Sequence, residues 1–190
     1  MRLRLARGSD AAAIRTLYAP FVTDTAVSFE EAVPDEVEVR RRLQDTLAVR
    51  PWLVAEADGA VVGYAYATAH RGRDAYRWSV EVSVYVDPAW HRRGTARRLY
   101  TALLAVLRLQ GFCNAYAGIA LPNAASVGFH EALGFEPVGV YRRVGFKAGA
   151  WRDVGWWALR LRDDDPPAPP RPLPEVAGAP AFEAALRGAP

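Results

Sequence analysis

The stretch that decides the fold runs from Val80 to Leu104 and reads VEVSVYVDPAWHRRGTARRLYTALL. Residues 80–86 are mostly β-branched or aromatic and predict a buried strand. Asp87-Pro88 ends that strand, and a turn containing Gly94 follows. From residue 97 to residue 110 the apolar side chains recur at helical spacing. The stretch therefore predicts a strand, a glycine turn and a helix in direct succession.

This turn has the chemistry of an anion site. The first N–H groups of a helix have no partner within the helix, and they attract negatively charged groups. Arg92 and Arg93 add positive charge at the same place. The spacing is neither GxxxxGK[ST] nor GxGxxG, so it does not indicate a nucleotide hydrolase loop or a dinucleotide fold. A glycine turn before a helix is also common without a ligand, and the spacing alone leaves both interpretations open.

The flanking sequence extends this unit into an α+β fold. The expected strands are residues 2–5, 52–57, 61–69, 80–86, 115–120, 138–146 and 153–161, and the expected helices are residues 11–22, 35–48, 97–110 and 125–134. Ser9-Asp10 is expected to cap the first helix, and Asp58-Gly59 to close a hairpin. The order β-α-α-β-β-β-α-β-α-β-β predicts helices packed on a mostly antiparallel sheet.

Length and composition point to one globular domain with an added tail. A chain of 190 residues with 51% hydrophobic and 24% charged residues is typical of such a domain. Composition changes after Leu161, where DDDPPAPPRPLPEV begins, so we expect a domain over residues 1–162 and a proline-rich extended tail over residues 163–190. The chain contains no apolar run of roughly 18 residues and no signal-peptide pattern, which predicts a cytoplasmic protein without a membrane segment.

Cysteine content and charge exclude several kinds of site. Cys113 is the single cysteine, so no disulfide can form within the chain and no second thiol is available for a metal site. A catalytic nucleophile is one interpretation of Cys113. It is better explained as a small buried hydrophobe.

The net charge of +3 suits a phosphate-bearing ligand. Basic and aromatic residues are not interleaved as in nucleic-acid-binding motifs, so no nucleic acid partner is expected. Trp151, Trp156 and Trp157 are read as alternating core positions of the last strand rather than as an interface.

Two motifs resemble the GNAT superfamily of coenzyme A dependent N-acetyltransferases. His91 to Ala96 is similar to the family signature [QR]xxGx[GA], with histidine in place of the first Gln or Arg. Asn123 is followed by Phe129 to Phe135, FHEALGF, which resembles the family's helix end with histidine where many relatives have tyrosine. The resemblance implies a mostly antiparallel mixed sheet of about seven strands flanked by about four helices, with strands four and five splayed at the coenzyme A site.

A closer resemblance, over residues 2–161, is to the phosphinothricin and methionine sulfoximine acetyltransferases of that superfamily. The matching stretches are PWLVAE (51–56), AYRWSVE (75–81), SVYV (83–86), LPN (121–123), HEALGF (130–135) and VGFK (144–147). The resemblance implies acetyl transfer from acetyl-CoA, without a metal, to the α-amine of a small amino acid such as phosphinothricin or methionine sulfoximine or sulfone. It also implies a homodimer. The alternatives are another amine or a protein N-terminus as acceptor, and a coenzyme A binding module without catalysis.

The same resemblance supplies roles for individual residues. Glu81 is the expected general base, and its place in an apolar strand predicts that it is buried, although a structural ion pair would also explain it. His130 is the expected proton donor near the sulfur, and a purely structural role is its alternative.

The binding residues follow in the same way. Those expected to hold coenzyme A are Val84, Tyr85 and Val86 through their backbones, Arg92, Arg93, Gly94, Thr95, Ala96 and Arg97 at the pyrophosphate, and Asn123, which also fits a helix cap. Those expected to bind the acceptor are Phe29, Glu30, Arg73 and Tyr76. An arginine there would grip a carboxylate, and an aromatic wall would orient the substrate.

Overall fold

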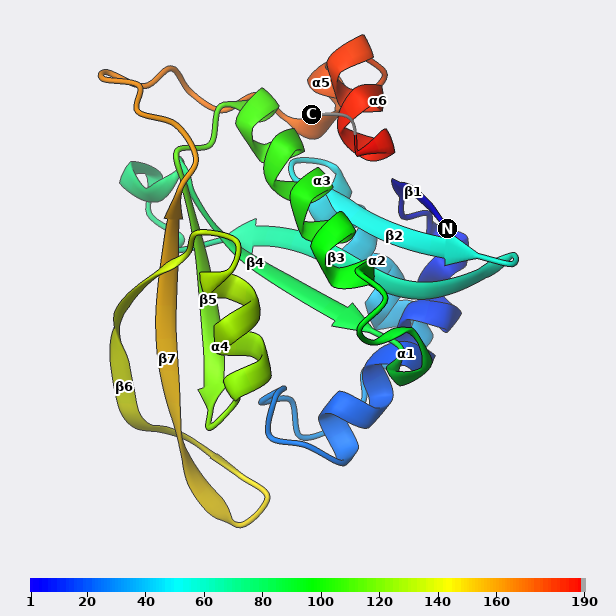
Figure 1. Cartoon of the computed structure of the whole chain (residues 1–190), viewed down its shortest axis with the longest axis vertical. Helices are drawn as coiled ribbons and strands as arrows, with labels where there is room; N and C mark the ends of the chain where they lie inside the picture. The colour runs from blue at the N-terminus through cyan, green and yellow to red at the C-terminus, as the bar shows by residue number, and fades with distance from the viewer. Residues whose placement is uncertain (189–190) are drawn as a thin grey trace.

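A single seven-stranded sheet, in the order β1-β2-β3-β4-β5-β7-β6, forms the centre of the protein (Figure 1). The computed structural model describes residues 1–188. The strands are β1 (Arg2–Leu5), β2 (Trp52–Ala57), β3 (Ala60–Ala69), β4 (Ser79–Val86), β5 (Asn114–Leu121), β6 (Glu136–Lys147) and β7 (Ala150–Arg160). Within the described residues β4 and β5 pair in parallel and the other neighbouring strands pair antiparallel. The predicted mixed, mostly antiparallel sheet is confirmed.

Helices cover both faces of this sheet. They are α1 (Ala11–Thr23), α2 (Glu36–Leu47), α3 (Thr95–Gln110), α4 (Ala124–Glu131), α5 (Leu173–Val176) and α6 (Pro180–Arg187), with short 3-10 turns at Gly8–Asp10, Asp74–Tyr76 and Pro88–Trp90. α3 packs on the main core together with β2, β3 and β4, whereas α1 and α2 build a second core cluster on the opposite face (Figure 1). Cys113 is buried, as expected, and burial raises the pKa of its thiol.

Local chemistry explains where the first helices begin. The Asp35 carboxylate accepts a hydrogen bond from the Glu38 N–H at 2.8 Å and caps α2. The corresponding expectation for α1 is wrong, because Asp10 precedes that helix without capping it through its side chain. Its carboxylate accepts instead from Arg4 at 2.7 Å and from the Arg7 N–H at 2.7 Å. Arg4 is nearly buried, and leaving its charge without a carboxylate partner would destabilise the protein more than leaving α1 without a side-chain cap.

Two adjacent strands of the sheet separate part-way along their length. β4 pairs with β5 over three positions, from Ser79 with Asn114 to Glu81 with Tyr116. Beyond Glu81 the strands diverge, and α4 lies beside the opening in Figure 1. Backbone groups of β4 that would have bonded β5 are left without a strand partner, and buried groups of this kind require another one. The splay therefore marks a place for an extended ligand, as the resemblance implied.

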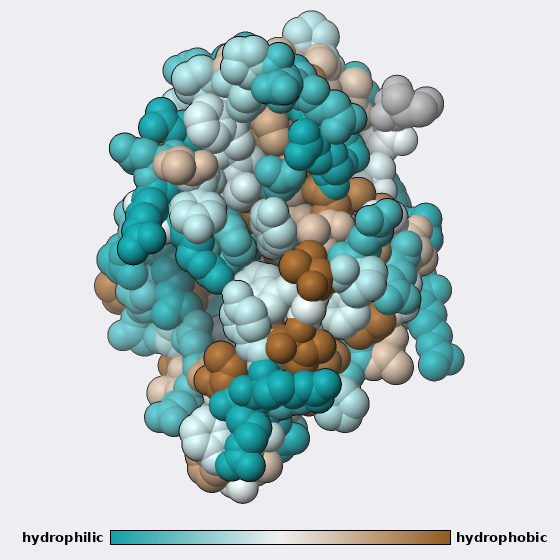
Figure 2. Space-filling view, turned by 90° about the vertical axis from the view of Figure 1, so that its left-hand side faces the viewer, coloured by the Kyte–Doolittle hydropathy of each residue, from teal (hydrophilic) through white to brown (hydrophobic). Residues whose placement is uncertain are grey.

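The β6–β7 hairpin projects beyond the other strands at the far edge of the sheet (Figure 1). Its apolar side chains are unusually exposed and include Val138, Val140, Tyr141, Val144, Phe146 and Trp151. Figure 2 looks onto this side of the molecule and shows hydrophobic side chains gathered among hydrophilic ones. Of the three tryptophans assigned to the core, only Trp157 lies there; Trp156 is half-buried on the other face of β7, and Trp151 is 52% exposed.

The C-terminal segment returns to the body of the protein. Residues 163–172 have no regular secondary structure, and α5 and α6 then pack against α3. Val106 of α3 forms a small core cluster with Leu173, Val176, Phe182 and Ala185. In the part of the chain that the structure describes, every helix is too short or too polar to cross a membrane.

Candidate active site

The splay between β4 and β5 opens into a narrow space of about 80 Å³, which we call the strand cleft. Its walls come from β4, β5, α4 with its capping residue, one residue of α3 and one residue of the segment between α1 and α2. The lining residues are Val27, Val82, Ser83, Val84, Tyr85, Tyr100, Ala117, Gly118, Ile119, Ala120, Asn123, Ser126 and His130. The cleft is therefore bounded by backbone on two sides and by a small polar group of side chains near its α4 end.

A wider cavity of about 500 Å³, the loop cavity, adjoins the strand cleft. It lies under the irregular segment of residues 24–35 that joins α1 to α2. Its lining residues are Tyr18, Val27, Ser28, Phe29, Glu30, Glu81, Tyr85, Gly118, Ala120, Val154 and Trp156. Four residues line both spaces, namely Val27, Tyr85, Gly118 and Ala120. One extended and one compact ligand could therefore meet where the two cavities join.

Glu81 stands at this junction, as the last residue of β4 that is paired with β5. Its expected burial is wrong: the side chain is 30% exposed. The carboxylate accepts a hydrogen bond from His70 Nδ1 at 3.1 Å and lies 3.3 Å from the Arg71 guanidinium. Because an ionised carboxylate can only accept, Nδ1 of His70 carries a proton. Glu81 is thus a carboxylate fixed in direction and facing the loop cavity.

His130 is buried on the other side of the junction. Its Nδ1 donates to the Ser126 carbonyl at 2.7 Å, and its Nε2 lies 3.0 Å from the Tyr100 hydroxyl. Burial lowers the pKa of His130, against the opposing effect of the Ser126 carbonyl, so the neutral ring is favoured. In that tautomer the Tyr100 hydroxyl donates to Nε2. The two side chains form one hydrogen-bonded pair that lines the strand cleft.

The predicted anion site lies at the start of α3. Gly94 has a left-handed conformation with φ of 77°, and α3 begins directly after it without a side-chain cap. The first N–H groups of the helix are therefore free for a ligand. Thr95 is buried, and its hydroxyl has no hydrogen-bond partner within residues 1–188. An unpaired buried hydroxyl beside free N–H groups and exposed arginines fits a pyrophosphate.

The other predicted residues of this turn have individual positions. Arg92 and Arg97 are exposed, and the Arg93 guanidinium lies over the Trp90 ring at 5.2 Å. Ala96 is half-buried in the first turn of α3. His91, which replaces the usual Gln or Arg, turns back: its Nε2 lies 3.0 Å from the Val86 carbonyl. That carbonyl is consequently occupied by the protein itself.

Val84 and Tyr85 line the strand cleft, whereas Val86 lies just beyond it. The ring of Tyr85 packs edge-on against Tyr18 and Phe21, so its backbone is held firmly on the side facing the cleft. Asn123 caps α4, since its Oδ1 accepts from the Ser126 N–H at 3.1 Å, and it lines the cleft as well. Both of the roles considered for Asn123 are compatible with this position.

The residues predicted to bind the acceptor divide into two groups. Phe29 and Glu30 line the loop cavity, where the Glu30 carboxylate pairs with Arg42 at 2.6 Å. Arg73 and Tyr76 lie on an exposed loop outside that lining. Tyr76 still approaches the site through His70, whose ring centroid is 6.0 Å from its own.

Among the site residues that were not identified from the sequence, four have side chains placed to bind or to position another group. His70 and Arg71 reach Glu81 from the end of β3, Tyr100 holds His130, and Trp156 lines the loop cavity. A polar pair directly after an apolar strand, His70-Arg71 after residues 61–69, was the one available signal, because polar groups at strand ends often serve a site. Trp156 carried none, since neighbouring Trp157 is an ordinary core residue.

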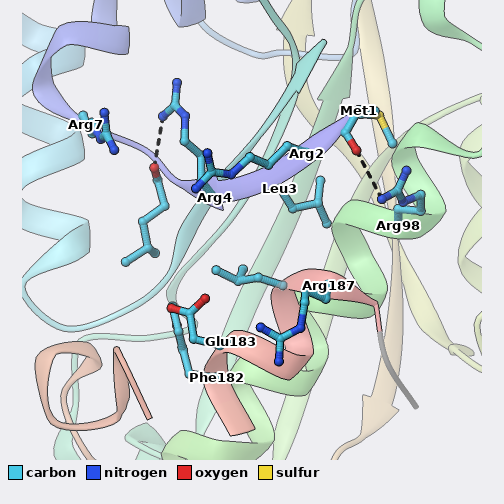
Figure 3. Close-up of a pocket in the computed structure, with 11 residues that line it drawn as sticks. Met1, Arg2, Leu3, Arg4, Arg7, Arg98, Phe182, Glu183 and Arg187 are labelled. Carbon is cyan, nitrogen blue, oxygen red and sulfur yellow. Dashed lines mark hydrogen bonds between the residues drawn. The ribbon is translucent and has the colours of Figure 1, made fainter. Parts of the chain in front are cut away.

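A larger cavity, of about 770 Å³, lies elsewhere, between β1, the start of α3 and α6 (Figure 3). Arg2, Arg7, Arg98 and Arg187 surround it, with Phe182 at its base. Its lining includes no residue of β4, β5 or the segment 24–35, so it does not join the two cavities described above. Within residues 1–188 no group of three or more His, Cys, Asp or Glu side chains could hold a metal ion.

The sequence of this chain is similar to those of known acetyltransferases. The family described as "Acetyltransferase (GNAT) domain" matches residues 3–156. A phosphinothricin N-acetyltransferase of Streptomyces viridochromogenes is 42% identical over 93% of this chain and 94% of its own. An L-methionine sulfoximine/L-methionine sulfone acetyltransferase of Salmonella typhimurium is 36% identical over 88% of this chain and 98% of its own.

A solved structure of a similar protein has the same fold. The phosphinothricin acetyltransferase of Sinorhizobium meliloti in complex with acetyl-CoA superposes with a TM-score of 0.83 at 34% identity, covering 88% of this chain and 91% of that one. The donor is acetyl-CoA, and the residues at the start of α3 fit its pyrophosphate. The chain accordingly belongs to the GNAT acetyltransferases, as an acetyl-CoA-dependent enzyme that transfers an acetyl group to the amine of a small molecule.

Proposed function

We propose that the acceptor is the α-amine of a small amino acid such as phosphinothricin or methionine sulfoximine or sulfone. The names of the relatives support this class. One observation carries the proposal: Glu81 lines the loop cavity, and 3.3 Å from it lies Arg71, whose guanidinium is placed over the ring of Trp156, another lining residue. An amino acid carries an ammonium and a carboxylate two bonds apart, and this pair offers one opposite charge to each.

The residues of the site divide the chemistry between them. Acetyl-CoA, when bound, supplies a thioester carbonyl that an amine can attack. Glu81 takes the proton from the acceptor's ammonium, directly or through a water, and His70 keeps the carboxylate directed toward the cavity. An unpaired N–H of β4 in the strand cleft, from Val84 or Tyr85, donates to the carbonyl oxygen as negative charge develops on it.

His130 acts on the departing sulfur through Tyr100 in this proposal. Burial lowers the pKa of His130 and raises that of Tyr100, so both are neutral and the hydroxyl retains its proton. The Tyr100 hydroxyl gives its proton to the departing thiolate by turning from His130 Nε2 toward the sulfur, so that His130 positions the hydroxyl before the transfer. The pair acts as a unit if His130→Phe, Tyr100→Phe and the double variant lower kcat equally; unequal, additive losses would refute the coupling.

The donor is bound by the cofactor residues that the sequence indicated. Arg92, Arg93, Gly94, Thr95, Ala96 and Arg97 hold the pyrophosphate, and Asn123 contacts coenzyme A from α4. Phe29 and Glu30 form one wall of the acceptor site, and Arg73 and Tyr76 remain predictions for its rim. The Arg73→Ala substitution tests that position, and an unchanged KM for the amine would remove Arg73 from the site.

The substrate proposal is tested by thiol release from acetyl-CoA over a panel of amines, with mass spectrometry of the product. L-phosphinothricin, L-methionine sulfoximine and L-methionine sulfone should each be acetylated. The carboxamide of L-methionine sulfone is the matched control, because it retains the amine and the side chain but lacks the carboxylate. Turnover of the carboxamide, of spermidine or of a peptide N-terminus at equal kcat/KM would overturn the assignment to amino acids.

We also propose that the enzyme is a homodimer in the cytoplasm. The exposed apolar side chains on the edge hairpin β6–β7 support a second copy as the partner, because apolar surface of this kind is usually covered. Analytical ultracentrifugation should give twice the monomer mass for the wild type. The Val144→Glu variant should be a monomer, because it places a charge within the exposed apolar surface. A monomeric wild type would refute the dimer. Cell fractionation tests the location.

We propose residues 1–162 as the catalytic domain and residues 163–190 as an addition to it. Every residue that lines the strand cleft or the loop cavity precedes residue 163, which supports this division. A chain ending at residue 162 should lose stability, since Val106 would be uncovered, and should keep its KM for acetyl-CoA. A truncated, folded chain that no longer bound acetyl-CoA would place part of the site in the tail.

A further inference from the structure

One wall of the loop cavity is a segment without regular secondary structure, residues 24–35. Val27, Ser28, Phe29 and Glu30 of this segment line the cavity. Tyr18 of α1 bonds this segment: its hydroxyl lies 2.6 Å from Ser28 Oγ and donates to the Glu30 carboxylate at 3.2 Å. A chain segment with so few bonds of its own keeps one conformation only if other elements fix it.

Lys147, at the end of β6, supplies such a fixation. Its Nζ donates to the carbonyl of Val22 at 2.8 Å and to the carbonyl of Glu30. Val22 lies in the last turn of α1, where carbonyls lack an N–H partner within the helix and a cation is favoured. Glu30 lies eight residues further along the chain. A single ammonium group therefore ties Glu30, the last of the segment's lining residues, to the end of the preceding helix α1.

A second contact from the same strand face holds the middle of the segment. Gly145 lies two residues before Lys147, and alternate residues of a strand share a face. A Cβ built on Gly145 would meet the Phe29 ring at 2.2 Å, so the ring sits directly against the Gly145 backbone. Phe29 and Glu30 are thus positioned by two successive residues on one face of β6.

Lysine has the chemistry that this position needs. An ammonium is a compact point charge with three donors, and it can reach two carbonyls that converge on it from different segments. A guanidinium is a wider, planar fork that suits carboxylates. Lys147 is the one lysine among the 24 basic residues of this chain. A chain that uses arginine everywhere else has lysine where arginine would fit poorly.

We infer that Lys147 is a positioning residue for the amine substrate: by bonding the Val22 and Glu30 carbonyls, it holds the wall of the acceptor site in its binding conformation. This inference rests on the proposed use of the loop cavity by the acceptor. The donor-binding residues lie on β4, α3 and α4, which Lys147 does not contact. Loss of the ammonium therefore affects binding of the amine and leaves binding of acetyl-CoA unchanged.

The kinetic test compares Lys147→Met and Lys147→Arg with the wild type. Both variants should raise the KM for the amine roughly tenfold, because the two hydrogen bonds of the ammonium that hold the wall of the site are lost or distorted, with the KM for acetyl-CoA unchanged. Arg142→Met is the matched control, because it removes a cation from the same hairpin at a side chain that is 78% exposed and paired only with Asp153. Full rescue by arginine would show that charge alone matters and would overturn the inference.

A structural readout makes the inference independent of the substrate assignment. Glu-C protease should cleave the Lys147→Met variant after Glu30 or Glu31 much faster than the wild type or Arg142→Met. Gly145→Ala, which displaces Phe29 without touching the ammonium, should loosen the same segment. Circular dichroism and thermal unfolding identify any variant that has lost its fold. Failure of all amines in the wild type would refute the proposed function, whereas unchanged cleavage in a folded Lys147→Met variant would refute the role of Lys147.

Discussion

The Nδ1 atom of His70 lies 3.1 Å from the carboxylate of Glu81, and the ring of His70 stacks on Tyr116 with centroids 4.4 Å apart. Tyr116 is also the residue of β5 that pairs with Glu81 in the sheet. The imidazole is thus clamped between the carboxylate and a ring on the neighbouring strand. This arrangement fixes the direction in which the expected base presents its oxygen atoms, at the point where β4 and β5 separate.

Replacing His70 by phenylalanine keeps the stack on Tyr116 and removes the hydrogen bond to Glu81. We expect kcat/KM for the amine to fall roughly tenfold, because a hydrogen bond to a charged group is lost, with the KM for acetyl-CoA unchanged. Steady-state kinetics with each substrate varied in turn measures both values. His91→Phe is the contrasting variant: His91 bonds the Val86 carbonyl on the donor side and does not contact Glu81, so its loss should leave the KM for the amine unchanged. An unaltered kcat/KM in His70→Phe would show that Glu81 does not need this partner.

Thr95→Val removes the buried hydroxyl that has no partner in the described chain. Valine has the same shape without a polar atom, so the ligand-free protein should be at least as stable. Coenzyme A should bind several-fold more weakly, because a donor to the pyrophosphate is lost. Thermal unfolding and calorimetric titration with coenzyme A check the two effects. Thr101→Val, at an exposed position of α3, should change neither. Unchanged affinity in Thr95→Val would remove this hydroxyl from the donor site.

Burial of His130 makes stability depend on pH in a definite direction. Its folded-state pKa lies below the ordinary value of about 6.5, because burial penalises the charged ring. Between the folded and unfolded pKa values the unfolded chain binds more protons, so stability is complete above about pH 6.5 and falls as the pH is lowered. Denaturant unfolding from pH 5 to pH 8 should show a smaller loss in His130→Phe than in the wild type. Equal losses would contradict the assignment, since His70 and His91 are present in both proteins.

Phe182 of α6 is 2% exposed and packs in the cluster around Val106. We expect Phe182→Ala to destabilise the protein by about 3–5 kcal/mol, the usual effect of removing a buried phenylalanine ring. Activity at low temperature should be unchanged, because this cluster does not line either cavity of the site. Glu183→Ala, at an exposed position beside it, should cost less than about 0.5 kcal/mol. A large loss of kcat in a folded Phe182→Ala variant would connect the tail to catalysis.

The donor side of the site was predictable because its parts are contiguous in sequence. Glu81, the turn at Gly94 and the start of α3 lie within one strand, turn and helix; local patterns predict these elements, whereas the family resemblance supplies the roles of the residues. Asn123 was indicated similarly, as a cap followed by a helix. These residues needed no knowledge of the sheet order.

The acceptor side could not be predicted in the same way, because the sheet brings its parts together from distant segments. Trp156 faces the cavity only since β7 inserts between β5 and β6. His70 reaches Glu81 through the antiparallel pairing of β3 with β4.

The expectation that Glu81 is buried was wrong because of the sheet topology. An apolar strand is normally covered on both faces, but β5 diverges from β4 after Tyr116. Asp10 differs from its expected role because Arg4 competes for its carboxylate.

The most direct test of the account is the pH dependence of kcat/KM for acetylation of L-methionine sulfone by the wild type and by Glu81→Gln. Glutamine has the same shape and accepts the bond from His70, but it cannot take a proton from the amine. We predict that Glu81→Gln lowers kcat by about 10²–10⁴-fold, leaves the KM for acetyl-CoA unchanged and removes the acidic limb of the profile. An unchanged rate with an unchanged profile would contradict the assignment of Glu81 as the base at the junction of the two cavities.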